Sequence, residues 1–183
     1  LARRMISKCD VVVENFRTGA LDQYGLSYDQ IREEFPSLIY CSVTGFGQTG
    51  PYATRGGYDY LVQGMGGIMS VTGQPDGPPE KVGVGVSDII TGMYATIAIQ
   101  AALRHRESTG EGQHIDMALL DSQVAWLSYV GENYLVSGEG ETHGAERKIA
   151  CADGAAPTSS DFDVNSWGEE WYEGPKESFS FCN

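Results

Sequence analysis

The sequence predicts an α/β fold, a partial Rossmann-like parallel sheet with flanking helices. Two short apolar or β-branched runs and a third strand-like segment alternate with longer stretches of helical periodicity along the first 137 residues. Unbroken apolar strands suit a sheet that is covered on both faces. The first two runs are separated by a helix-length segment, which implies a parallel pair with a right-handed crossover.

The expected elements follow from local signals. Strands are predicted at 10–14, 37–43 and 111–117. Helices are predicted at 27–34, 58–71, 87–106 and 119–136, the second of them interrupted by glycines. Ser27 and Gln30 fit a capping box that opens the first of these helices, and Pro36 stops it.

The clearest helix begins at Ser87, with apolar residues at intervals of three and four: Ile89, Ile90, Met93, Tyr94, Ile97 and Ala101. Ser87 is the expected N-cap, which puts Asp88 in the first turn. There the free N–H groups and the helix dipole favour an ionised carboxylate. Such a group is available as a nucleophile toward an activated acyl carbon. The alternative is an ordinary first-turn acid that only stabilises the helix.

The loop Gly45–Gly50 matches the G-x-G-x-x-G pattern of dinucleotide-binding proteins. That function needs a helix opening at the loop and an acidic residue at the end of a second strand about 20 residues later. Residues 51–57 are typical of a continuing loop instead. A glycine loop that lets another ligand approach closely is therefore favoured, with a nicotinamide-dependent oxidoreductase as the alternative.

Two further segments suit ligand binding. Asn15, Phe16 and Arg17 follow the first strand, where α/β proteins usually bind ligands. An amide, an aromatic face and a guanidinium could hold an adenine ring and phosphates; an ordinary strand-end loop is the alternative. Residues 55–59 have the same ambiguity. The four cysteines lack metal-type or redox-type spacing, so no metal site is predicted.

Charge and composition exclude several classes of protein. Twelve Lys and Arg against 25 Asp and Glu give a net charge of −13, so no broad nucleic-acid footprint is expected. No apolar run reaches the roughly 18 residues of a spanning helix without interruption, so no membrane partner is expected. Reduced thiols indicate a cytoplasmic protein, or a mitochondrial matrix protein in a eukaryote. The start at Leu1 without a signal sequence indicates a truncated chain.

The composition changes near Gly138. Residues 1–137 carry 15 acidic and 9 basic side chains, whereas residues 138–183 carry 10 and 3 and contain neither Leu nor Met. The aromatic residues of this later segment keep no regular period. We therefore expect a domain at 1–137 and an atypical, weakly ordered acidic tail at 138–183.

Four motifs in order resemble the class III CoA-transferases, the group that includes formyl-CoA:oxalate, succinyl-CoA:glutarate and carnitine CoA-transferases. They are DVVVENFRTGAL at 10–21, TGFGQTGP at 44–51, GYD at 57–59, and GVSD followed by TGM at 85–93. The resemblance covers residues 1–137. It implies the large domain of that family and a transfer of CoA between small carboxylic acids.

The resemblance also implies roles for residues. Asp88 would attack the acyl-CoA thioester, giving an acyl–aspartyl anhydride and then an aspartyl–CoA thioester. CoA is a co-substrate, and no permanently bound cofactor is implied. Residues that would contact CoA are Asn15, Phe16, Arg17, Gly57, Tyr58 and Asp59. Family members form interlocked homodimers, so a non-catalytic assembly fragment remains a further alternative.

Overall fold

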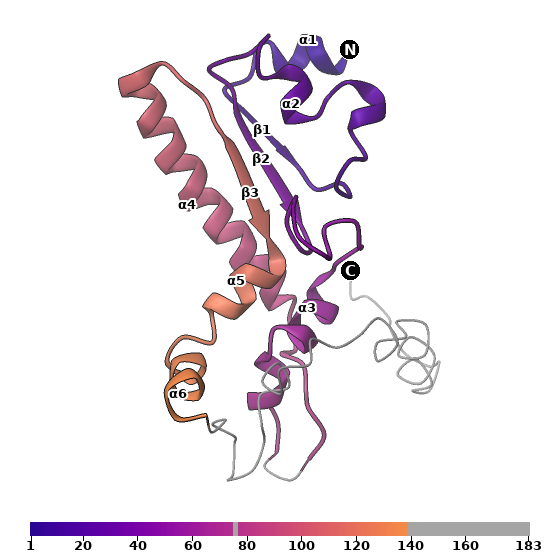
Figure 1. The fold of residues 1–183 in the computed structure, drawn as a ribbon, viewed down its shortest axis with the longest axis vertical. Coiled ribbons are helices and arrows are strands. Elements are labelled where there is room, and N and C mark those ends of the chain that lie inside the picture. Colours follow the sequence, from indigo (N-terminus) through magenta and orange to yellow (C-terminus); the bar gives the residue numbers. More distant parts are fainter. Residues whose placement is uncertain (75–76, 139–183) are drawn as a thin grey trace, which may run out of the picture. The chain divides into compact units, whose positions relative to one another are not determined.

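The computed structural model describes residues 1–74 and 77–138. Its centre is a three-stranded parallel sheet in the order β1-β2-β3 (Figure 1), which confirms the predicted fold class. The strands are β1 (Val11–Glu14), β2 (Ile39–Thr44) and β3 (His114–Ala118). The predicted tail, apart from Gly138, lies outside the described residues.

Helices pack on both faces of the sheet, as predicted, but β1 is only partly covered, since Val13 is 58% exposed. The connection from β1 to β2 contains η1 (Asp22–Tyr24) and α2 (Tyr28–Ile31); the connection from β2 to β3 contains α3 (Asp59–Met65), η2 (Ile68–Val71) and α4 (Val86–Thr109). In Figure 1, α4 runs along one side of the sheet, while α1 (Ala2–Ile6) and α2 lie on the other.

The face toward α2 is closed by a small core around Tyr40. Its ring is 2% exposed and packs with Ile31 and Leu38. The Tyr40 hydroxyl donates to the carbonyl of Leu26 at 3.0 Å. Burial, followed by the charge of Glu14, raises the pKa of Tyr40 to about 12. This tyrosine is therefore a neutral part of the core at all ordinary pH values.

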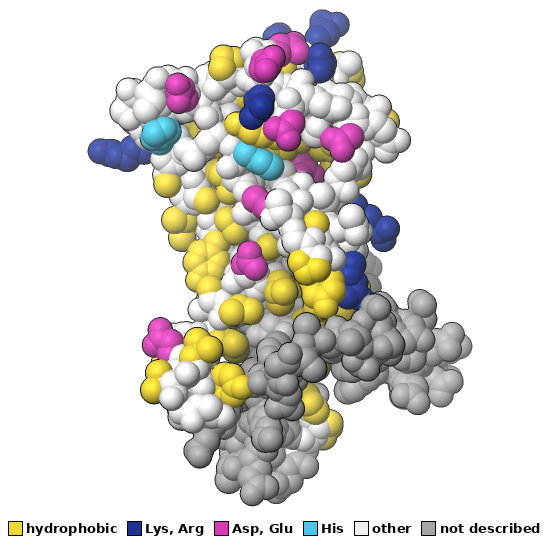
Figure 2. All heavy atoms as spheres, viewed as in Figure 1, with side chains coloured by type: hydrophobic (Ala, Val, Ile, Leu, Met, Phe, Trp, Pro, Cys, Tyr) yellow, Lys and Arg dark blue, Asp and Glu magenta, His cyan; other side chains and the backbone are white. Residues whose placement is uncertain are grey.

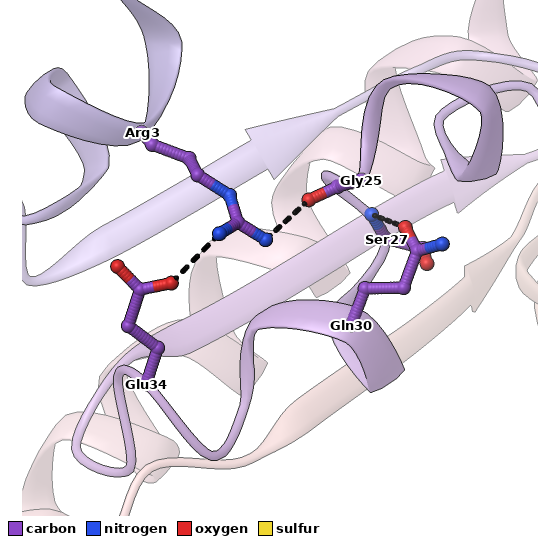
Figure 3. Close-up of polar contacts among 5 residues, drawn as sticks. All are labelled: Arg3, Gly25, Ser27, Gln30 and Glu34. Carbon is purple, nitrogen blue, oxygen red and sulfur yellow. Dashed lines mark hydrogen bonds and ion pairs between the residues drawn. The ribbon is translucent and has the colours of Figure 1, made fainter.

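Polar contacts cap the start of α2 and join α1 to the segments on either side of α2 (Figure 3). The backbone N–H of Ser27 donates to Oε1 of Gln30 at 3.3 Å, which forms the capping box predicted at the start of α2. Arg3 donates to Glu34 Oε2 and to the carbonyl of Gly25, both at 3.0 Å. The Arg3–Glu34 pair is half exposed, so it positions α1 more than it stabilises the fold.

The longest helix, α4, packs against β2, β3, α3 and α5. Its other face is apolar and uncovered in the described chain: Ile89, Met93 and Ile97 are 55%, 61% and 62% exposed. By length and mean hydropathy α4 could cross a membrane, which differs from the expectation that no segment has that composition. One third of its apolar window is buried, and its packing on the sheet is that of a helix covering a core. The face shown in Figure 2 has many charged side chains near α1 and α2, and farther along it shows hydrophobic side chains with a few charged ones among them.

Some helix predictions were wrong. The helix predicted over 119–136 is broken into α5 (Leu119–Ala125) and α6 (Tyr129–Ser137). Between them Ser128 has a φ of 50° and a ψ of −129°, which lie outside helical geometry and end the regular helix. The helix α1 was not predicted at all, and α2 ends at Ile31 instead of Glu34.

Candidate functional site

The predicted ligand loops lie at one edge of the sheet. Because all three strands are parallel, the segments after β1 and β2 emerge at the same end. Asn15 links them directly, since its side-chain amide donates to the carbonyl of Val43 at 2.6 Å. Thr18 adds a second link through its hydroxyl, which lies 3.3 Å from the carbonyl of Gly47. Asn15 therefore has a structural partner within the sheet edge.

Phe16 and Arg17 differ in their surroundings. The ring of Phe16 is 58% exposed, which leaves an aromatic face open to a planar ligand. The guanidinium of Arg17 lies over Gly56, close enough that a Cβ there would meet Nη2 at 3.3 Å. The structure thus brings the segment after β1 against the segment that leads into α3, as a joint ligand site requires.

Gly57 is needed for close backbone contact. A Cβ added at Gly57 would overlap the Cα of Gly45, and a Cβ at Gly45 would overlap Gly57 in return. The two glycines therefore let the loop after β2 pack backbone to backbone on the segment before α3. Backbone packing alone therefore accounts for glycine at positions 45 and 57, with no need for a bound ligand. It also fixes the direction in which the chain continues into Tyr58 and α3.

The Gly45–Gly50 loop lacks the geometry of a dinucleotide site. No helix opens at its end; residues 51–58 are turns and extended backbone, and α3 begins only at Asp59. Two of its N–H groups already have protein acceptors. Gly47 N donates to Thr44 Oγ1 and Gln48 N donates to Asp116 Oδ2, both at 2.9 Å. Because both N–H groups already donate to protein oxygens, they are not free to bind a pyrophosphate.

Tyr58 and Asp59 begin α3 and behave differently. The ring of Tyr58 is 51% exposed beside the loop, where it can contact a ligand. The carboxylate of Asp59 faces α4 instead: its Oδ1 accepts the backbone N–H of Ser87 at 2.7 Å and that of Asp88 at 3.3 Å. The side chain of Asp59 is thus placed beside the predicted nucleophile.

Asp88 lies in the first turn of α4, as predicted, but the expected cap is wrong. The N-cap is Gly85, and Ser87 is a fully buried residue inside the helix. Partial burial, followed by the charge of Asp59, raises the pKa of Asp88 above its ordinary value. The expectation that free N–H groups favour the ionised form is therefore also wrong, since Asp59 occupies them. Within the described chain, the Asp88 carboxylate accepts no hydrogen bond and faces solvent.

We expect Asp88→Asn to make the fold slightly more stable at pH 7. Because the pKa of Asp88 is higher in the folded chain than in the unfolded chain, ionising Asp88 lowers the free energy of unfolding. The stability that protonated Asp88 contributes is complete below the ordinary pKa of 3.8 and is lost as the pH rises through the pKa of the folded chain. The neutral amide avoids that loss. The gain should be about 1–2 °C in melting temperature, because the group is exposed and screened by water.

Thermal melts by circular dichroism at pH 7 and at pH 3 measure this difference. The gain should disappear at the lower pH, where both side chains are neutral. A variant that melts below the wild-type chain at pH 7 would contradict the stated sign.

Sequence reasoning missed two buried glutamines that contact Asp59 and Ser87. Gln63 and Gln123 are both 0% exposed. The hydroxyl of Ser87 donates to Gln123 Oε1 at 2.5 Å, which ties α4 to α5. Gln63 Nε2 donates to Asp59 Oδ2 at 2.7 Å. The signal available in the sequence was a polar residue inside each apolar helical stretch, Leu-Val-Gln in α3 and Ser-Gln-Val in α5.

No cluster of three or more His, Cys, Asp or Glu side chains in residues 1–74 and 77–138 could hold a metal ion.

A comparison with protein families shows which family this chain belongs to. The model of CoA-transferase family III matches residues 1–162. The chain belongs to CoA-transferase family III. The family match confirms the resemblance that the four motifs indicated.

Individual relatives agree with the family III assignment. The chain is 61% identical over 138 residues to a succinate–glutarate CoA-transferase of Agrobacterium fabrum, covering 75% of this chain and 34% of that protein. It is 46% identical over 136 residues to the human succinyl-CoA:glutarate CoA-transferase, covering 74% and 31%. The chain thus spans about a third of the length of these curated relatives.

A solved structure supports the fold of this family III chain. A CAIB/BAIF family protein from Brucella suis is 53% identical, with a TM-score of 0.76. The match covers 80% of this chain and 39% of the Brucella protein. The sheet and the helix carrying Asp88 are therefore set in a known family architecture.

Proposed function

We propose that this protein moves CoA between an acyl-CoA and a small carboxylic acid, with Asp88 as the nucleophile. The observation that carries the proposal is the exposed Asp88 carboxylate at the start of α4, in a chain that belongs to CoA-transferase family III. The named activities of the relatives from Agrobacterium fabrum and humans support succinyl-CoA and glutarate as the first pair to try.

The reaction begins at the Asp88 carboxylate. One of its oxygens attacks the thioester carbonyl, the C–S bond breaks, and CoA leaves as a thiolate. The product on the protein is a mixed acyl–aspartyl anhydride. Partial burial and the nearby Asp59 charge raise the pKa of Asp88, so the ionised group is more basic than an ordinary aspartate.

The CoA thiolate then attacks the aspartyl carbonyl of the anhydride. This step frees the donor carboxylate and leaves CoA attached to Asp88 as a thioester. The acceptor carboxylate attacks that thioester, releasing CoA thiolate and giving a second anhydride. Attack of the thiolate on the acceptor's acyl carbon gives the new acyl-CoA and restores Asp88. Each cycle consumes one acyl-CoA and one carboxylate and needs no permanently bound cofactor.

The proposed CoA site extends from Asp88 across the sheet edge. Phe16 and Tyr58 offer exposed rings to the adenine or the pantetheine chain, and Arg17 offers a positive charge to a phosphate. Asn15 and Gly57 shape the loops that present these groups, through the Val43 contact and the Gly45 contact. Asp59 contributes its backbone to the same surface.

We also propose that the protein works as a homodimer, as the family resemblance implies. The support in the structure is the apolar face of α4 that residues 1–74 and 77–138 leave uncovered, where Met93 and Ile97 are more than half exposed. Side chains of this kind are usually covered by further protein.

The proposal is tested by incubating the protein with succinyl-CoA and deuterated glutarate and following deuterated glutaryl-CoA by mass spectrometry. Formation of the labelled thioester supports it. If no donor–acceptor pair among succinate, glutarate and oxalate exchanges, the proposal fails for this chain and a non-catalytic assembly role is favoured. NAD binding that is lost in Gly47→Val would instead favour the oxidoreductase alternative, against which the engaged loop N–H groups argue.

A further inference from the structure

The first turn of α4 has no free backbone donors. A helix start normally leaves its first N–H groups without partners in the helix. Here Val86 N donates to Val84 O at 2.8 Å, and Ile89 N donates to Gly85 O at 3.1 Å. The two groups between them, on Ser87 and Asp88, both donate to Asp59 Oδ1. A side chain from α3 therefore completes the start of α4.

The capping carboxylate is itself held by a buried amide one turn along α3. Gln63 Nε2 donates to Asp59 Oδ2 at 2.7 Å and to the carbonyl of Val84 at 3.2 Å. Gln63 Oε1 accepts the backbone N–H of Val82 at 2.8 Å. Gln63 thus joins Asp59 to the extended segment that enters α4, so the backbone is fixed on both sides of Gly85.

We propose that Asp59 is a positioning residue that fixes the backbone of Ser87 and Asp88 and thereby orients the Asp88 carboxylate toward the acyl carbon. The inference rests on the proposed function, and it assigns the Asp59 side chain to the helix start instead of to CoA. Two carboxylates then have separate tasks: Asp59 takes the N–H groups of the turn, while Asp88 stays free of them and open to substrate.

Asp59 is the charged side chain that acts on Asp88 at the first turn of α4. From α3 the neighbouring groups are Asp59 and the neutral Gln63; from α5 the nearest is the neutral Gln123. The Lys81 ammonium, on the segment before α4, contacts the carbonyls of Val82 and Gly83. In the described part of the chain, neither aspartate has an ion-pair partner. Removing the Asp59 charge should therefore act on Asp88 directly.

The test variant is Asp59→Asn in the full chain, which keeps the size of the side chain and one acceptor oxygen. It removes the charge and turns an amide toward the Gln63 donor. The matched control is Asp121→Asn, which removes an exposed first-turn charge from α5. Three quantities are measured: the Asp88 carboxyl titration by ¹³C NMR, hydrogen exchange at the Ser87 amide, and kcat and KM for CoA transfer.

We expect Asp59→Asn to lower the pKa of Asp88 and to speed exchange at the Ser87 amide about tenfold. In the transfer reaction kcat should fall by about 10²-fold with little change in KM, since the reacting oxygen is misplaced while the substrate still binds. The control should change none of these. An unchanged Asp88 titration with a raised KM for acyl-CoA would overturn the inference and make Asp59 a CoA contact.

A measurement on the wild-type chain keeps the inference testable if the variant does not fold. The ¹H shift of the Ser87 amide should follow the titration of the Asp59 carboxyl during a pH titration; an amide that does not respond to Asp59 overturns the inference. The titration and exchange readouts do not depend on turnover. A chain with the expected titrations but no transfer would therefore contradict the proposed function and leave the capping role standing.

Discussion

Asp88→Asn is expected to abolish CoA transfer, lowering kcat by at least about 10³-fold. The amide has nearly the size of the carboxylate but cannot form the anhydride, so chemistry is lost while the site keeps its shape. The Asp88 side chain accepts no hydrogen bond in the described chain, so its loss disrupts no contact. The measurement is the initial rate of acyl-CoA formation, together with the affinity for CoA by titration calorimetry.

The control for that result is Asp121→Asn, an exposed first-turn acid on α5 with no proposed role. It should leave the rate and CoA binding unchanged. Transfer by Asp88→Asn at a rate close to that of the unmodified protein would remove Asp88 from the mechanism. Loss of CoA affinity together with loss of turnover would instead place Asp88 in binding.

Gly57→Ala is expected to lower the free energy of unfolding by about 3 kcal/mol. The added methyl would overlap the Cα of Gly45, which is buried at the end of β2. Backbone atoms on both sides must then move apart, and no flexible side chain is available to yield. Denaturant titration followed by circular dichroism measures the free energy of unfolding.

Gly92 on α4 is the control position, because there an added methyl group overlaps no other segment. A Cβ at Gly92 would have no heavy atom within 4 Å, apart from those of its own helix turn. Because glycine is unfavourable inside a helix, Gly92→Ala should stabilise the chain by about 0.5–1 kcal/mol. Equal effects of the two substitutions would contradict the close packing of Gly57 on Gly45.

The sheet was predictable because its signals are local. The strands β1 and β2 are short apolar runs, and β3 is a short segment around Ile115, so all three were located within a few residues. The break at Ser128 was not predictable in the same way. Apolar residues continue through it at helical spacing, and only the backbone angle shows that the helix stops.

The candidate site shows the same division between local and distant signals. The position of Asp88 in a first turn follows from the sequence of α4 alone. Its cap does not, because the acceptor is Asp59, which is 29 residues earlier in the chain. Gln63 and Gln123 were missed for the same reason: a buried amide is recognised by its partners, and those partners lie in other helices. Partial burial, followed by the charge of Asp59, raises the pKa of Asp88, so the expected effect of the helix start is reversed.

Trapping the covalent intermediate shows whether Asp88 carries the transferred group. The protein is incubated with isotopically labelled succinyl-CoA, quenched in acid, digested and analysed by mass spectrometry. We expect an acyl or CoA adduct on the peptide containing Asp88, and hydroxylamine should remove it. An adduct on any other side chain, such as the exposed Cys9 thiol, in a protein that turns over would contradict it.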